Sequence, residues 1–137
     1  MTLDKKNAKL QNGSTLAYIG DAVVEVFVRS TLIRLGISDT GRFNELALNF
    51  VTAHAQSEAF AKVTQLLTED EKEILTRGRN AKLTHRPKNQ TQSDYRRATG
   101  FEALMGYLYL TGDGQRAEYL FEKSYEDVIL GIKNKML

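Results

Sequence analysis

The sequence predicts an all-α protein, a bundle of helices joined by short connections. Pro87 is the only proline among the 137 residues, and proline is the residue that most strongly interrupts a helix. No stretch alternates apolar and polar residues between turns in the way that marks a half-buried strand. Several stretches instead repeat apolar residues every three to four positions, and capping residues stand at their ends.

The ends of the expected helices follow from local capping chemistry. Asn12, Gly13 and Ser14 can cap the first helix, and Gly36 ends it. Thr68, which heads the acidic run TEDEKEIL, is typical of another helix N-terminus. We expect helices over residues 14–35, 42–67 with a break near Thr52, 68–78, from Ser93 or Asp94 to 111, and 115–133.

Composition limits the chemistry that this chain can perform. The sequence has no cysteine, which excludes disulfides, thiol catalysis and cysteine-ligated zinc, and two histidines are too few for a histidine-rich metal site. The N-terminal MTLDKKNAKL lacks the apolar stretch of a signal peptide. No apolar run approaches the roughly 20 residues that span a bilayer. We therefore expect a cytoplasmic protein without membrane attachment.

Positive charge is concentrated in one segment. The whole chain has a net charge of +2, yet residues 76–97 hold seven basic residues and a single acid, Asp94. Residues 79–93 within it show little periodicity and contain Pro87, so we predict a long loop there. A cationic block on an otherwise acidic body favours a surface that binds a polyanion. A merely solvated loop is the alternative.

Two strongly apolar segments each carry acids near the middle. Asp21 and Glu25 are the only charged residues in LAYIGDAVVEVFV (16–28), and Glu102 is the only one in ATGFEALMGYLYLTG (98–112). Each helix should be covered on most sides, and an unpaired buried carboxylate costs several kcal/mol. Such acids are retained when they pair, accept hydrogen bonds or bind a cation. Carboxylates without cysteine ligands suit Mg²⁺ or Mn²⁺.

Structural roles for these acids remain open alternatives. Either acid could cap a neighbouring helix or pair with an arginine, for which the candidates are Arg29, Arg96 and Arg97. Gly20 and Gly100 stand close to the acids and lower helix propensity, which indicates a close approach of backbone or ligand. Gly106 is expected to serve a contact between helices.

The residues around both acids resemble the signatures of the ribonuclease III family. LAYIGDAVVE (16–25) resembles the first signature, Leu-Gly-Asp-Ala-Val, and TGFEALMG (99–106) resembles the second, Phe-Glu-Ala-Leu-Ile-Gly. RGRNAK, PKN and YRRATGFEAL are similar to the Mini-ribonuclease III branch, which lacks a double-stranded-RNA-binding domain. The resemblance covers about residues 14–133, and the chain ends soon afterwards.

The resemblance implies the helical bundle of a ribonuclease III endonuclease domain. It implies that residues 1–137 are a single catalytic domain, with a core over about 14–133 and a basic RNA-binding loop over about 76–97. The expected activity is cleavage of double-stranded RNA by a homodimer that uses Mg²⁺, or Mn²⁺ in its place. The expected substrate is the precursor of large-subunit (23S) ribosomal RNA, and a ribosomal protein that presents it is a further expected partner.

The resemblance also assigns roles to particular residues. Asp21 and Glu102 correspond to the signature acids, which are catalytic metal ligands. Ala17 and Thr99 stand where full-length ribonuclease III has two further carboxylates, so the number of metal ions is open. Glu25 could assist Asp21, or simply pair with a nearby basic residue.

Binding roles are expected for the loop and for one tyrosine. Tyr18 occupies the position of an aromatic dimer contact in the family, and an ordinary core tyrosine is the alternative. His54 is expected on a helix surface and His85 in the loop, neither with a catalytic role. The expected RNA-binding residues are Arg77, Arg79, Asn80, Lys82, Arg86, Lys88 and Asn89, with Gln90 as a possible further hydrogen-bond donor.

Two other functions are compatible with the sequence. One is a non-catalytic module of the same fold that binds double-stranded RNA or the ribosome, which the missing carboxylates would explain. The other is a helical protein-interaction domain whose basic block binds an acidic partner. Metal-dependent cleavage distinguishes the enzyme from both.

Overall fold

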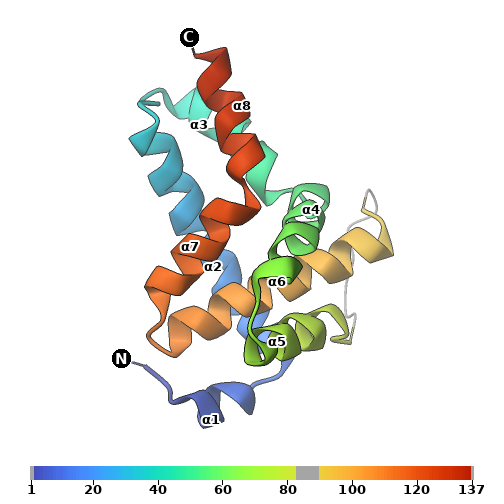
Figure 1. The fold of residues 1–137 in the computed structure, drawn as a ribbon. Coiled ribbons are helices and arrows are strands. Elements are labelled where there is room, and N and C mark those ends of the chain that lie inside the picture. The colour runs from blue at the N-terminus through green and yellow to red at the C-terminus, as the bar shows by residue number, and fades with distance from the viewer. Residues whose placement is uncertain (1, 83–89, 137) are drawn as a thin grey trace.

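The computed structural model describes residues 2–82 and 90–136, and within these ranges it contains helices and no strand (Figure 1). The all-α prediction is therefore confirmed. In chain order the elements are α1 (Lys5–Lys9), α2 (Gly13–Arg34), α3 (Thr40–Val51), α4 (Ala53–Val63), the 3₁₀ turn η1 (Thr64–Leu66), α5 (Glu69–Arg79), α6 (Gln92–Leu110), α7 (Gly114–Ser124) and α8 (Glu126–Lys135).

Most helix ends agree with the capping residues in the sequence. Asn12 caps α2, where its Oδ1 accepts from the Thr15 amide at 2.8 Å. The break near Thr52 is confirmed, since Thr52 has an extended backbone and caps α4. Thr68 and Glu71 form a reciprocal capping box at the start of α5. Helix α6 begins two residues earlier than expected, because Thr91 is its cap.

The single helix expected over residues 115–133 is wrong. The chain leaves the helical conformation at Tyr125 (φ −115°, ψ 16°), which separates α7 from α8. The Tyr125 ring is buried against Phe50, Phe101 and Phe121. Its hydroxyl donates to the Phe50 carbonyl at 2.8 Å. This anchored side chain fixes the break, which the helical periodicity did not reveal.

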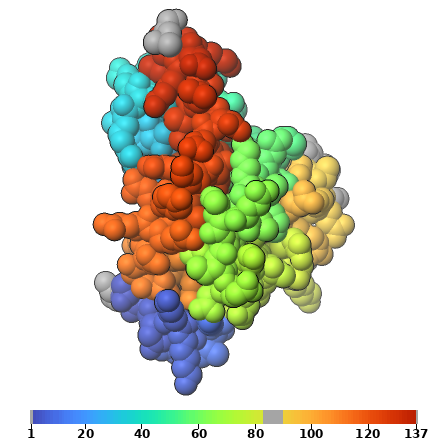
Figure 2. Space-filling model, in the orientation of Figure 1, coloured from blue at the N-terminus to red at the C-terminus, as the bar shows by residue number. Residues whose placement is uncertain are grey.

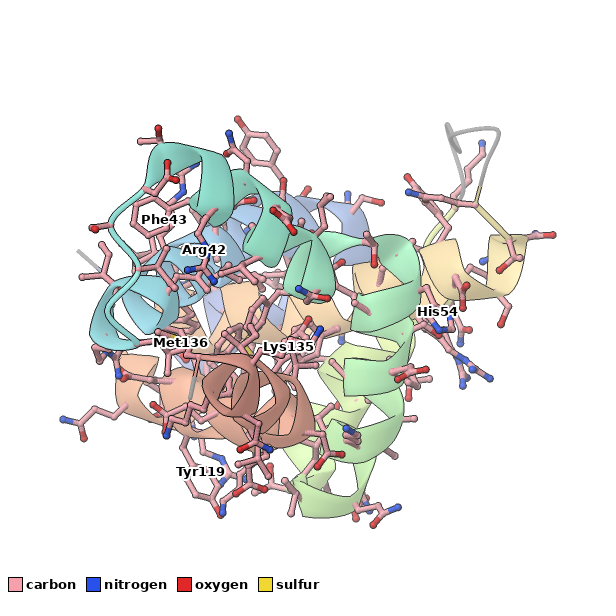
Figure 3. All side chains as sticks on the ribbon, turned by 90° about the horizontal axis from the view of Figure 1, so that it is seen from above. Arg42, Phe43, His54, Tyr119, Lys135 and Met136 are labelled. Atoms are coloured by element: carbon pink, nitrogen blue, oxygen red, sulfur yellow. The ribbon has the colours of Figure 1, made fainter. Side chains whose placement is uncertain are left out.

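Helix α6 lies in the middle of the bundle and packs against α2, α4 and α5 (Figure 1). Its apolar side chains, among them Phe101, Leu104 and Met105, are fully buried, and burial of each stabilises the fold by about 2 kcal/mol. The side chains of the surrounding helices fill the space between the ribbons (Figure 3). Glu102, the acid that the sequence singled out in this segment, therefore lies on the central helix of the bundle.

Helix α2 is less covered than its sequence predicts. Leu16, Val24 and Val28 are buried, but Tyr18 is 84% exposed and Val26 is 61% exposed. Ile33 on the same helix and Leu48 on α3 are also exposed. The expectation of a helix covered on most sides is thus wrong for the single chain, and an apolar stripe remains on its surface.

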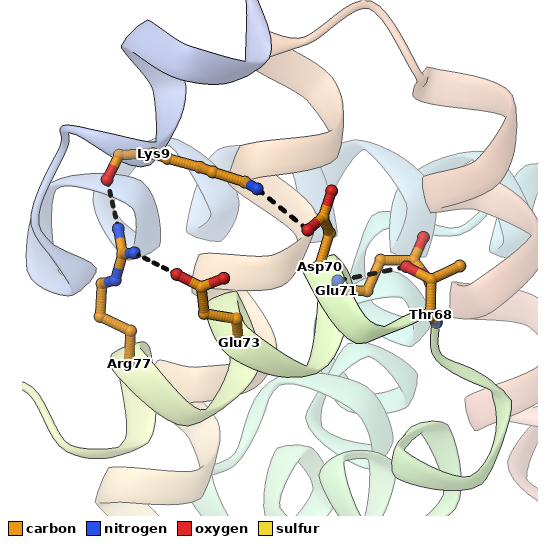
Figure 4. Close-up of polar contacts among 6 residues, drawn as sticks. All are labelled: Lys9, Thr68, Asp70, Glu71, Glu73 and Arg77. Carbon is orange, nitrogen blue, oxygen red and sulfur yellow. Dashed lines mark hydrogen bonds and ion pairs between the residues drawn. The ribbon is translucent and has the colours of Figure 1, made fainter.

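The N-terminal segment is attached to α5 and α6. The Leu3 amide donates to the Leu110 carbonyl at 2.7 Å, and Lys9 pairs with Asp70 at 2.9 Å. The Arg77 guanidinium donates to the Lys9 carbonyl (Figure 4). In space-filling view this segment lies at one end of the molecule and α8 at the other (Figure 2). No helix in the described ranges is both long and apolar enough to cross a membrane.

Candidate active site

The two signature acids come together because α2 and α6 approach each other through glycines. A Cβ built on Gly106 would lie 2.0 Å from the Leu16 carbonyl oxygen, and Gly20 faces the backbone of Glu102 in the same way. No larger residue fits at either position. This contact places Asp21 on α2 beside Glu102 on α6, and both side chains line one cleft.

The cleft has a volume of about 390 Å³ and is formed by α2, the end of α3, α4, α5, α6 and the residues that flank the 83–89 segment. Ala17 and Thr99, the two positions that lack the additional family carboxylates, line the same cleft. The sequence correspondence therefore agrees with the spatial arrangement. The remaining polar and basic residues of the cleft are Ser14, Tyr18, Gln56, Arg79, Lys82, Gln90, Tyr95 and Arg96.

The two acids differ in their surroundings. Asp21 is exposed rather than buried, contrary to the expectation from its apolar helix, whereas Glu102 is half-buried in the wall of the cleft. Burial raises the pKa of Glu102 to about 9, and the neighbouring Asp21 carboxylate adds to this shift. A hydrogen bond from Gln56 lowers the Glu102 pKa but does not offset burial. Within the part of the chain that the structure describes, no basic side chain is among the groups that shift the Glu102 pKa, so no neighbouring cation there stabilises the charged form of this carboxyl.

The donor set of this cleft suits a hard divalent cation. Among the ion pairs of residues 2–82 and 90–136, none includes Asp21 or Glu102. The same ranges contain no group of three or more acidic, histidine or cysteine side chains placed to hold a metal ion. Mg²⁺ is commonly bound by only one or two carboxylates, with water and substrate phosphate as its other ligands. Two carboxylates at an open cleft meet that requirement.

The structural alternatives for the acids can now be compared with the contacts. Arg29 pairs with Glu25 at 3.3 Å, so the reading of Glu25 as a partner for a basic residue is confirmed. Arg96 donates to the carbonyls of Arg79 and Ala81 at 3.4 and 3.3 Å. Neither arginine neutralises the acids of the cleft.

The predicted RNA-binding residues divide into three groups. Arg79 and Lys82 line the cleft, and Asn80 is exposed between them. Arg77 lies apart from the cleft lining and is engaged with the N-terminal segment and with Glu73 at 2.9 Å (Figure 4). Arg86, Lys88 and Asn89 lie outside the described residues, as does His85.

Tyr18 and His54 both lie on the protein surface. Tyr18 is at the edge of the cleft and strongly exposed, so the core-tyrosine alternative is wrong. His54 projects from the surface of α4 (Figure 3), where it lies 3.0 Å from Glu58 and 3.5 Å from Asp94.

The sequence did not single out Gln56 or Tyr95. Gln56 is one of several polar residues in α4, and only the packing of α4 on α6 brings it into the cleft that Glu102 lines. Arg96 was counted in the basic block, but its position in the cleft depends on the turn after α5.

Comparison with known proteins places this arrangement in a family. Residues 14–113 match the model of the ribonuclease III domain. The chain is 41% identical to a Mini-ribonuclease 3 of Enterococcus faecalis, an alignment that covers 84% of this chain and 89% of that protein. It is 40% identical to a Mini-ribonuclease 3 of a Thermoanaerobacter species, over 81% of this chain and 78% of that protein.

A solved structure agrees with these matches. The crystal structure of a Fusobacterium nucleatum protein superposes with a TM-score of 0.70 at 26% identity, and it covers 93% of this chain and 96% of that one. The matched region includes Asp21, Glu102 and the glycines that bring them together. The chain therefore belongs to the ribonuclease III family of endoribonucleases.

Proposed function

We propose that this chain is a divalent-metal-dependent endoribonuclease that cleaves double-stranded RNA, with its catalytic centre at Asp21 and Glu102. The observation that carries the proposal is that both signature acids line one cleft together with Arg79, Lys82 and Arg96. We further propose that residues 1–137 form a single catalytic domain that acts in the cytoplasm on precursors of large-subunit ribosomal RNA.

Asp21 and Glu102 would hold Mg²⁺, or Mn²⁺ in its place. When bound, such a cation lowers the pKa of a coordinated water and neutralises charge on the scissile phosphate. In its absence, burial keeps a proton on Glu102, because the raised pKa lies above neutral pH. The glycine contact between α2 and α6 fixes the distance between the two helices that carry the acids.

The basic residues would bind the RNA backbone. A-form RNA is recognised mainly through phosphates and 2′-hydroxyls across its minor groove. Arg79 and Lys82 line the cleft beside the acids, and Arg96 is held there by two backbone carbonyls. These three cations would place a phosphate beside Asp21 and Glu102. RNA contacts are proposed as well for Asn80, which is exposed at the end of α5, and on the sequence alone for Arg86, Lys88 and Asn89.

A homodimer would cover the apolar stripe of α2. Tyr18, Val26 and Ile33 are strongly exposed on one helix, with Leu48 exposed on the adjacent α3. An exposed apolar patch of this kind is typical of a protein–protein contact. Two copies related by a twofold axis would bring two clefts to one RNA duplex and permit cleavage of both strands.

The test is cleavage of a labelled RNA duplex and of a labelled large-subunit rRNA precursor, with Mg²⁺ or with EDTA. We expect metal-dependent cutting that Asp21→Asn and Glu102→Gln abolish while RNA binding persists. Glu25→Gln is the matched control, because Glu25 lies one turn from Asp21 but pairs with Arg29.

Different results would select among the remaining alternatives. RNA binding without cutting would favour the non-catalytic module, for which the neutral Ala17 and Thr99 are the motivating observation. Cutting of the duplex but not of the precursor would refute the rRNA assignment alone. If precursor cutting appears only after ribosomal proteins are added, a presenting partner is required.

A further inference from the structure

Gln56 is a buried polar side chain in the lining of the catalytic cleft. It lies in the first turn of α4, and only 4% of its surface is exposed. Its backbone amide is bonded to the Thr52 carbonyl at 3.0 Å, which fixes the turn from which its side chain projects. Burial of an amide without a partner costs about 1–3 kcal/mol, so this side chain requires a specific contact.

Gln56 and Glu102 line the same cleft, where α4 packs on α6. There the Gln56 amide favours the ionised form of the carboxylate and so lowers the Glu102 pKa. Glu102 therefore lies between Asp21 on α2 and Gln56 on α4, and the three side chains line the same cleft. Three different helices fix the position of these groups.

Because the Gln56 amide is neutral, it affects the Glu102 carboxylate differently from a basic side chain. An arginine or lysine in the place of Gln56 would orient Glu102 but would also cancel its charge. An amide N–H orients one carboxylate oxygen and leaves the negative charge available to a cation. Groups that hydrogen-bond to a metal-binding carboxylate typically change metal affinity or activity by about 10- to 100-fold when they are removed.

We propose that Gln56 is a positioning residue, whose amide holds the Glu102 carboxylate toward Asp21 and thereby sets the affinity of the cleft for a divalent cation. This inference rests on the proposed function, because it requires that Asp21 and Glu102 bind the cation. It adds a third residue, from α4, to the two that the sequence signatures identify.

The test measures Mn²⁺ binding to the full chain without RNA, by the loss of the free-ion signal in electron paramagnetic resonance. Gln56→Met keeps the length of the side chain and removes its donors. We expect it to weaken Mn²⁺ binding by about 10-fold or more and to raise the Mg²⁺ concentration needed for half-maximal cleavage. RNA affinity in Ca²⁺ should stay within about twofold of the wild type, because Gln56 carries no charge.

Two controls separate positioning from general damage to α4. Ser57→Ala changes the adjacent residue, which is equally buried but does not line the cleft, and it should leave Mn²⁺ binding unchanged. Gln56→Asn keeps an amide but draws it back by one methylene, so it should weaken binding as Gln56→Met does. It also serves as the test if Gln56→Met does not fold.

The possible failures are distinguishable. Wild-type Mn²⁺ affinity in both Gln56 variants would overturn the positioning role and leave the proposed function intact. Equal weakening by Ser57→Ala would overturn it as well, because the effect would then belong to the helix. Absence of Mn²⁺ binding by the wild type would overturn this inference and the metal-dependent function together.

Discussion

Gly20 lies directly against the backbone of Glu102, so that a Cβ built on the glycine would be 1.7 Å from the Glu102 carbonyl oxygen. Gly20 directly precedes Asp21 in the sequence. The same contact that allows α2 and α6 to pack therefore also places one signature acid beside the other. Gly20, the glycine of the first signature, is therefore required for the packing of α2 on α6 as well as for the position of Asp21.

Gly20→Ala should destabilise the protein by about 3 kcal/mol, because the clash is with backbone and one of the two helices must move. Thermal or urea unfolding monitored by circular dichroism measures the change. Gly131→Ala is the matched control, since nothing lies within 4 Å of a Cβ at Gly131 in α8. It should stabilise by about 0.5–1 kcal/mol. Equal effects of the two changes would contradict the helix contact.

Glu102→Gln should stabilise the metal-free protein at high pH. In the folded chain the pKa of Glu102 is about 9, whereas its ordinary value is 4.5. Between these values the unfolded chain releases a proton that the folded chain keeps, so wild-type stability falls as pH rises through this window. The advantage of the variant should begin above about pH 5 and grow to several kcal/mol near pH 9, because each unit of pKa difference corresponds to about 1.4 kcal/mol.

The measurement is urea unfolding in EDTA over this pH range. Mg²⁺ or Mn²⁺ should reverse the order, because a cation that binds the folded state stabilises the wild type and has lost a ligand in the variant. A difference that is independent of both pH and metal would show that Glu102 is not held protonated in the cleft.

The basic residues near the end of α5 should have separable roles. Arg79→Glu combined with Lys82→Glu should reduce RNA affinity at least 10-fold and lower the slope of log affinity against log salt, because two phosphate contacts are lost. Stability should change by less than about 0.5 kcal/mol, since both side chains are exposed. Fluorescence anisotropy of a labelled duplex over a salt series measures the effect.

Arg77→Met is expected to show the opposite pattern. The Arg77 guanidinium donates to the Lys9 and Gln11 carbonyls and pairs with Glu73, and these contacts attach the N-terminal segment to α5. The variant should lose about 1–2 kcal/mol of stability and keep most of its RNA affinity. A large loss of affinity with unchanged stability would restore Arg77 to the RNA-binding group that the sequence predicted.

Tyr18→Asp should dissociate the proposed homodimer, because it places a charge in the apolar stripe on α2 at its most exposed residue. Size-exclusion chromatography with light scattering measures the mass directly. Tyr119→Asp is the control, since Tyr119 is also exposed but lies on α7 beside Arg116 and Lys123. A wild-type monomer, or a dimer that survives Tyr18→Asp, would refute the assignment of this surface.

Local rules were enough to predict much of the fold. The caps at Asn12 and Thr68 and the break at Thr52 depend on side chains within three or four residues of the helix end. They could therefore be predicted without knowledge of the neighbouring helices. The break at Tyr125 depends on a hydroxyl that bonds to Phe50, far away in the chain, and the periodicity of 115–133 could not show it.

The candidate site likewise has features that the sequence predicted and features that it could not predict. The sequence by itself determined the helical class, the family and the two acids, because signature residues and helical periodicity are local patterns. Only the tertiary structure decided that Arg77 is committed to the N-terminal segment, that α2 keeps an exposed apolar stripe, and that Gln56 meets Glu102. Each of these three features depends on which helices pack together. Such packing brings together residues that are far apart in the sequence, and no local pattern of residues reveals those contacts.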